Sequence, residues 1–228
     1  MTSSTPTASD WNDYWRVSRR SEAIYAWIAN IYRKFIICKS LKRSFARHVA
    51  RGSVCLHAGS GSGEVDLVLL RDWKIYGLDF SREAVSRYQS SHDRVATVVQ
   101  ADNFFLPFKN NQFECVFNLG VMEHFTQTEI KAMLAEFKRV IRPGGVVILF
   151  WPPVYGLSVL SLKVVHWIVR LVNPRFKPLH PAEISLVRNR SSIRQLLLEA
   201  GFADIMFKFE LRDLYTHEVI VSRNPVTN

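Results

Sequence analysis

The sequence has few cysteines and no long apolar runs. Three of its 228 residues are cysteine, an odd number that lacks the paired spacing of a zinc site. Cys55 and Cys115 stand in apolar stretches, so we expect buried thiols, no disulfide and no metal. No stretch has the roughly 18 uncharged apolar residues of a spanning helix. The opening MTSSTPTASD lacks the features of a signal peptide, which favours the cytoplasm, and it predicts a disordered end.

Acidic residues are also scarce, and the scarcity is local. The chain carries 30 Lys and Arg against 20 Asp and Glu, a formal charge of +10. Residues 16–51 contain ten Lys or Arg against Glu22 alone, and residues 151–190 contain six against Glu183 alone. Two basic peripheral segments favour an anionic partner, whether a membrane surface, a phosphorylated substrate or a nucleic acid.

What the chain does have is a regular alternation of two patterns after residue 52. Short apolar stretches predict strands over 53–58, 74–80, 96–102, 113–120, 146–151, 205–210 and 217–223. Helical spacing of apolar residues predicts helices over 21–49, 64–70, 82–90, 128–141 and 191–200. This order predicts an α/β fold with a doubly wound, Rossmann-like sheet of seven strands. The sheet is expected to be mostly parallel with an antiparallel terminal hairpin, N-terminal helices and a helical insert after the fifth strand.

Polar residues follow the first three predicted strands. Gly59, Gly61 and Gly63 form a flexible turn after the first, where a backbone can approach a ligand closely. Asp79 ends the second strand and Asp102 the third. Because ligands of such sheets bind beyond the carboxyl ends of the strands, Asp79 is expected to accept bonds from ribose hydroxyls. Asp102 is placed for an exocyclic amine such as that of adenine, with an Asx turn as its alternative role.

Five blocks of sequence resemble the class I S-adenosylmethionine-dependent methyltransferases, in particular the type 11-like members that act on small molecules and lipids. The blocks are LHAGSGSGE, YGLDFS, QADNFFLPF, FNLGVMEHF and RVIRPGGVVILF, and they span about 54–150. The resemblance implies S-adenosylmethionine as cofactor. It divides the chain into an N-terminal tail and basic helical cap, 1–50, and a methyltransferase domain, 51–228, with the insert at 151–190. The cofactor residues that it implies, with their neighbours, are His57, Gly59, Ser60, Gly61, Gly63, Asp79, Phe80, Asp102, Asn103, Phe104 and Leu119.

His57 departs from the family pattern, which usually has Asp or Glu at this position. A neutral imidazole can still accept a hydrogen bond. It would lose a charge-assisted contribution of about 1 kcal/mol towards the cofactor's ammonium group. A purely structural histidine beneath the loop is the alternative interpretation.

Glu123 and His124 follow the fourth strand and are the candidate catalytic residues. His124 has the pKa range of a general base, and shaping the pocket is its alternative role. Candidates for acceptor binding are Tyr14, Arg19, Tyr155 and His180.

The two basic segments guide the prediction of the acceptor. Residues 154–172 are apolar apart from Lys163 and Arg170, which suits a helix lying in the plane of an anionic membrane surface, although a buried helix shows the same pattern. We therefore expect a cytoplasmic protein that associates peripherally with an anionic membrane surface and there transfers a methyl group to a small or lipid-linked acceptor. A soluble metabolite or sugar methyltransferase with 151–190 as lid is the first alternative. RNA methylation is less favoured because no RNA-binding module is recognisable, and a non-catalytic partner is the last alternative. The sequence leaves the oligomeric state open.

Overall fold

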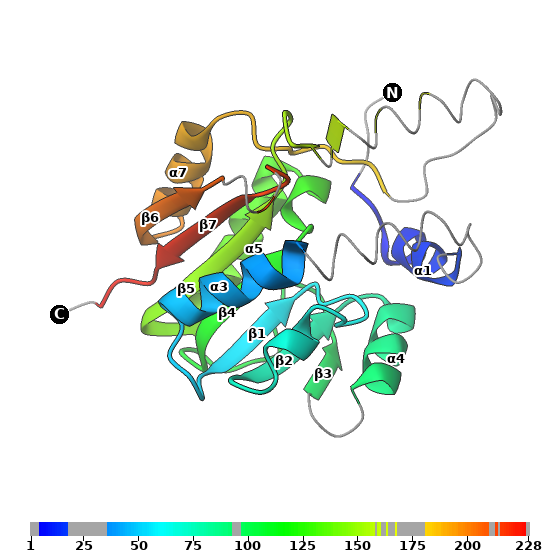
Figure 1. Ribbon diagram of the computed structural model, residues 1–228, viewed down its shortest axis with the longest axis horizontal. Coiled ribbons are helices and arrows are strands. Elements are labelled where there is room, and N and C mark those ends of the chain that lie inside the picture. The colour runs from blue at the N-terminus through cyan, green and yellow to red at the C-terminus, as the bar shows by residue number, and fades with distance from the viewer. Residues whose placement is uncertain are drawn as a thin grey trace.

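The structure is a computed structural model that describes residues 5–17, 36–92, 97–157, 159–160, 163, 167, 181–209, 213 and 215–226. One sheet of seven strands forms its centre, in the order β3-β2-β1-β4-β5-β7-β6 (Figure 1). The first five strands in the chain pair in parallel, and β7 pairs antiparallel with both β5 and β6. The predicted fold class, with its terminal hairpin at one edge, is confirmed. The strands are β1 Val54–Ala58, β2 Lys74–Asp79, β3 Thr97–Gln100, β4 Phe113–Leu119, β5 Ile141–Trp151, β6 Ala203–Lys208 and β7 Glu218–Arg223.

Helices cover both faces of the sheet because the strand side chains alternate between two apolar clusters. In β5, Val147 and Leu149 face the cluster that includes α5 Gln127–Val140 and α7 Arg190–Glu199. Val146 and Ile148 face the other cluster, which includes α3 Cys38–His48. Helix α4 Arg82–Ser91 contacts β2 and β3, and α1 Ala8–Val17 packs on α4. The predicted helix over 21–49 is present from residue 38, and residues 18–35 lie outside the described part.

Two local predictions are wrong. The expected helix over 64–70 is only a short 3₁₀ turn, η2 Asp66–Val68, because the Asp66 side chain is buried and bonded inside the domain. The opening, expected to be disordered, is helical from Ala8, and residues 1–4 lie outside the described part. The backbone N–H of Thr7 donates to the Asp10 carboxylate and that of Asp10 to the Thr7 hydroxyl, which caps α1.

The predicted turn over 143–145 lies inside the bounds of β5, where the strand is irregular. Phe113 pairs with Ile141, but Cys115 already pairs with Val146, so four residues of β5 have no partner of their own in β4. The regular part of β5 then extends to Trp151, next to the end of β4. This places the start of the insert beside the strand ends that carry the predicted cofactor residues.

Candidate active site

A cavity of about 680 Å³ opens at the carboxyl ends of β1–β4. The structure brings together there every predicted cofactor residue, both candidate catalytic residues and Tyr14. Tyr155 is not among the lining residues; its hydroxyl lies 3.2 Å from the Glu218 carboxylate. Arg19 and His180 lie outside the described residues. The cavity has a β1–β3 side, where the glycine loop and the two aspartates lie, and a β4–β7 side with Glu123, His124 and His217.

The glycine loop is packed tightly from beneath. Gly63 has a φ of +69°, and a Cβ there would lie 2.2 Å from the ring of Tyr88 in α4. Gly61 has a φ of +55° and is covered by the indole of Trp15 in α1, 2.7 Å from the place of a Cβ. Only glycine satisfies both the backbone conformation and the space. The loop is therefore held between α4 on one side and α1 on the other.

Asp79 connects the glycine loop to the end of β2. One carboxylate oxygen accepts the Gly61 N–H at 2.9 Å, and the other accepts the Ser81 N–H at 2.9 Å. Burial raises the pKa of Asp79, while these two backbone bonds act in the opposite direction. Each oxygen has a second lone pair, so the carboxylate can still accept ligand hydroxyls from the cavity.

Asp102 serves the loop after β3 as well as the cavity. One of its carboxylate oxygens accepts the Phe104 N–H at 3.0 Å, which is the Asx-type turn of the alternative interpretation. Asn103 and Phe104 also line the cavity, and the Phe104 ring meets that of Phe125 edge to face at 5.6 Å. Phe105 is instead 81% exposed. The turn and a ligand contact are compatible because only one of the two oxygens is engaged.

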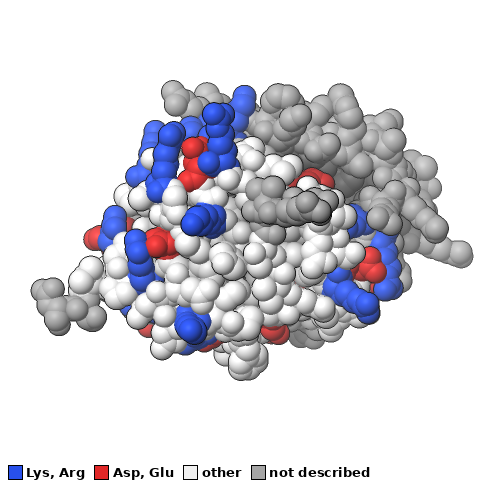
Figure 2. Space-filling model, turned by 90° about the horizontal axis from the view of Figure 1, so that it is seen from below, with Lys and Arg blue, Asp and Glu red and all other residues white. Residues whose placement is uncertain are grey.

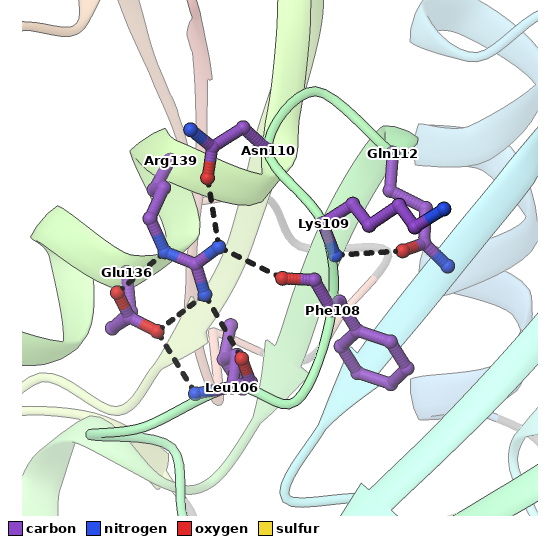
Figure 3. Close-up of polar contacts among 7 residues, drawn as sticks. All are labelled: Leu106, Phe108, Lys109, Asn110, Gln112, Glu136 and Arg139. Atoms are coloured by element: carbon purple, nitrogen blue, oxygen red, sulfur yellow. Dashed lines mark hydrogen bonds and ion pairs between the residues drawn. The ribbon is translucent and has the colours of Figure 1, made fainter.

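A guanidinium from α5 ties down the chain that follows this loop (Figure 3). Arg139 donates to the backbone carbonyls of Leu106 and Phe108 and to the Asn110 side chain, at 2.8–3.0 Å. Its other two N–H groups bind Glu136, whose carboxylate also accepts the Leu106 N–H at 2.8 Å. All five donors of the guanidinium are used. The loop between β3 and β4 thereby becomes part of the rigid body of α5.

His57 belongs to a buried polar chain under the glycine loop. Its Nδ1 lies 2.8 Å from the Asp66 Oδ1, and Asp66 Oδ2 accepts the Tyr88 hydroxyl at 2.8 Å. The imidazole stacks on Phe117 with ring centroids 4.3 Å apart. The side chain is 2% exposed, lines the cavity, and its Nε2 has no hydrogen-bond partner. Asp66 and Tyr88 were not predicted as site residues, since nothing in their sequence surroundings shows that they meet.

Glu123 and His124 lie in the short turn η3 Met122–His124 after β4. Burial, assisted by the charge of Glu183, raises the pKa of Glu123 to about 8. Its Oε2 has no partner. His124 lies with Nδ1 3.0 Å from the Ala182 carbonyl, and its ring meets Trp11 edge to face at 5.0 Å.

Sequence reasoning missed several lining residues from distant segments. Trp11 and Trp15 project from α1, and the aromatic stretch WNDYWR was their only signal. Glu183 comes from the returning end of the insert. His217 precedes β7, and burial lowers its pKa to about 4, so it is neutral at pH 7. No pattern near His217 indicates a site, because only the antiparallel return of β7 beside β5 brings it there.

Several polar atoms of the cavity lack hydrogen-bond partners in the protein. Eight buried side-chain nitrogen or oxygen atoms in the described residues make no hydrogen bond, and five belong to residues that line this cavity. Such atoms are costly unless a ligand or water satisfies them. A nucleoside linked to an amino acid supplies hydroxyls, an amine and ring nitrogens, and it therefore fits this lining. The five atoms are Trp11 Nε1, His57 Nε2, Ser60 Oγ, Asn103 Oδ1 and Glu123 Oε2.

Comparison with known proteins agrees with this lining. A family described as "Methyltransferase domain" matches residues 56–149. These residues form a methyltransferase domain. It is of the class I, S-adenosylmethionine-dependent kind, and S-adenosylmethionine is its cofactor. A putative S-adenosyl-L-methionine-dependent methyltransferase from Methanococcus maripaludis shares the fold, with a TM-score of 0.67 at 17% identity over 100% of this chain and 99% of that one.

The matches to sequence relatives cover only part of each protein. A probable tRNA methyltransferase 9B of Mus musculus is 29% identical over 69% of this chain and 31% of its own length. A ubiquinone/menaquinone biosynthesis C-methyltransferase of Cupriavidus taiwanensis is 33% identical over 41% of this chain and 44% of its own. The chain thus spans less than half of either relative. In the part of the chain that the structure describes, no helix has the length and apolarity needed to cross a membrane.

Proposed function

We propose that the protein transfers a methyl group from S-adenosylmethionine to a small or lipid-linked acceptor at an anionic membrane surface. The observation that carries this proposal is a row of exposed apolar side chains in the insert. Tyr155, Leu157, Leu160 and Trp167 are 46–64% exposed. Such side chains next to a basic segment suit the interfacial region of a bilayer.

The insert begins and ends at the cavity, which links the exposed row to the site. Pro152 lines the cavity at its start and Glu183 at its end. The end of the insert is hydrogen-bonded to the turn η3, because the Glu123 carbonyl accepts the N–H groups of Ile184 and Ser185 at 2.6 and 2.9 Å. An acceptor held in a membrane under the insert would therefore reach the mouth of the cavity.

The charge of the cavity restricts the reactive end of the acceptor. No Lys or Arg is found among the described lining residues, whereas six carboxylates line it. A phosphate or carboxylate next to the reacting atom would be repelled. We infer an uncharged or cationic reactive group, a hydroxyl or an amine, with any phosphate outside the cavity. The six are Glu64, Asp79, Asp102, Glu123, Glu129 and Glu183.

Glu123 is the proposed base, in place of His124, which the sequence favoured. The cofactor supplies an electrophilic methyl group, so the protein has only to align the acceptor and remove its proton. Glu123 presents an unpartnered oxygen, and its pKa of about 8 suits proton acceptance near neutral pH. His124 is held by the Ala182 carbonyl and by Trp11, an arrangement that orients the acceptor.

Methylation of RNA is the second candidate, because the mouse relative is named a probable tRNA methyltransferase. Figure 2 shows Lys and Arg side chains gathered on opposite sides of one face, with a nearly uncharged area between them. One basic group surrounds His48, whose pKa is lowered by burial and by Lys208, Arg47 and Arg223. A soluble metabolite or sugar methyltransferase, with the insert as lid, is a third possibility.

Flotation with vesicles distinguishes these candidates. We expect the protein to float with vesicles that contain phosphatidylserine and to stay behind with phosphatidylcholine alone. Changing Leu157, Leu160 and Trp167 together to Glu should abolish flotation, whereas a matched change of the exposed Leu198 and Val226 should not. Absence of flotation at low salt would refute the membrane proposal. Salt-sensitive retention of tRNA without flotation would favour RNA as the acceptor.

A further inference from the structure

Behind the glycine loop, a buried chain of three side chains connects α4 to the wall of the cavity. Tyr88 donates its hydroxyl hydrogen to Asp66, and Asp66 lies against the Nδ1 of His57 at the same 2.8 Å separation. Asp66 and Tyr88 have no exposed surface, and His57 has 2%. Such a chain in a dry environment holds its members in one arrangement.

The hydrogen bonds determine which nitrogen of His57 carries the proton. Both carboxylate oxygens of Asp66 face donors, so the Nδ1 of His57 bears a hydrogen. In the neutral ring, Nε2 is then an acceptor. It has no partner in the protein although it is buried in a residue that lines the cavity. Stacking on Phe117 prevents the ring from turning away.

The position of His57 along the strand ends indicates which part of the cofactor it meets. Asp102 follows β3 and Asp79 ends β2, while His57 lies in β1, between β2 and β4. If adenosine occupies the β2–β3 end, the methionyl part lies over β1. The methionyl amino group is a cationic donor, and a neutral Nε2 is a matching acceptor.

We propose that Asp66 and Tyr88 are positioning residues: their buried chain holds His57 as the Nδ1–H tautomer, so that its Nε2 is the acceptor offered to the methionyl amino group of the cofactor. This inference rests on the cofactor site and is independent of the proposed acceptor.

Two ligands separate this contact from general damage to the pocket. S-adenosylhomocysteine carries the amino group, whereas 5′-methylthioadenosine has the same nucleoside and thioether without it. We expect His57→Leu to weaken S-adenosylhomocysteine binding about tenfold by calorimetry, the effect of one hydrogen bond to a charged group, and to change methylthioadenosine binding less than twofold. His48→Leu, at a half-buried histidine outside the cavity lining, is the matched control.

His57→Leu leaves the buried Asp66 without one of its two partners, which can prevent folding. Two milder variants keep the test valid in that case. Tyr88→Phe and Asp66→Asn preserve shape and should each lower only S-adenosylhomocysteine affinity, by about threefold. Long-range ¹H–¹⁵N NMR should show His57 protonated at Nδ1, with an Nε2 signal that moves with S-adenosylhomocysteine and not with methylthioadenosine.

Three outcomes would overturn the proposal. Equal losses for both ligands would make His57 a structural support of the loop. Unchanged binding of both would remove it from the site. If Glu123→Gln no longer distinguishes S-adenosylhomocysteine from methylthioadenosine while His57→Leu still does, the amino group binds Glu123, another unpartnered acceptor of the cavity. If the unaltered protein binds neither ligand, the cofactor site itself is wrong.

Discussion

The two sides of the cavity are built in different ways. On the β1–β3 side, the contacts are local. Asp79 bonds Gly61 and Ser81, and Asp102 bonds Phe104, at sequence separations of 2–18 residues. On the β4–β7 side, the His124–Ala182 contact has a separation of 58 residues, and Trp11 packs on His124 from the far end of the chain. One side is assembled by a strand–turn–strand unit, and the other by segments that meet only in the folded domain.

The largest expected effect comes from a change on the β1–β3 side, where the contacts are local. Gly63→Val should abolish S-adenosylhomocysteine binding and lower the melting temperature, because its branched side chain would occupy the space of Tyr88 at a positive φ. Gly52→Val is the matched control: its φ is +82°, but nothing lies within 4 Å of its Cβ. The control should cost about 1–2 kcal/mol of stability and leave binding intact. Equal effects of the two changes would show that the backbone conformation alone matters.

A second change tests the β4–β7 side, which is built from segments distant in the sequence. Glu123→Gln should lower the methylation rate about 100-fold while S-adenosylhomocysteine affinity stays within a few fold. With the pKa raised to about 8, the ionised fraction and the rate should rise with pH up to about 8. This dependence should be lost in the variant. An unchanged rate and pH profile would exclude Glu123 as base.

The same raised pKa has a consequence for stability. Folding favours the protonated form of Glu123, so the folded state binds more protons than the unfolded state between pH 4.5 and about 8. Its contribution to stability is therefore present at low pH and falls as the pH rises through this window. Urea denaturation at several pH values should show a smaller decline for Glu123→Gln than for the unaltered protein.

A third change removes the hydrogen bonds that hold the loop between β3 and β4, on the β1–β3 side of the cavity. Arg139→Ala removes five hydrogen bonds, three to the 106–110 loop and two to Glu136, and should cost about 2 kcal/mol of stability. Arg139→Lys keeps the charge but cannot reproduce the planar set of donors, so it should recover less than half of the loss. Full recovery by lysine, measured by urea denaturation, would show that only charge matters.

The smallest expected effect lies where the two sides meet. Trp15→Ala removes the indole over Gly61, to which Arg87 also contributes a cation–π contact at 5.5 Å. Cofactor should then dissociate about fivefold faster in stopped-flow measurements, an effect near 1 kcal/mol. The exposed Trp167→Ala should leave this rate unchanged. If the cofactor dissociates at a similar rate from the unaltered protein, Trp15→Ala and Trp167→Ala, then α1 does not retain the cofactor.

The sequence predicted the local side well because its signals are local. Apolar alternation identified all seven strands, and the glycines and acids at successive strand ends marked the cofactor loop. One of the errors shows what such local signals miss. The helix expected at 64–70 is a short turn because Asp66 turns inwards to reach His57 and Tyr88, and periodicity cannot reveal a contact across 22 residues.

Several roles on both sides of the cavity needed the structure. The role of His57 depends on Asp66, that of Glu123 on burial and Glu183, and that of α1 on its packing over the loop. Taken alone, the sequence determined the strands and the glycine loop, because backbone conformation and strand periodicity depend on neighbouring residues. Its resemblance to a known family identified the cofactor. Which carboxylate keeps its proton, and which nitrogen faces the cavity, was decided only by the tertiary structure, because desolvation and hydrogen bonding depend on segments far apart in the chain.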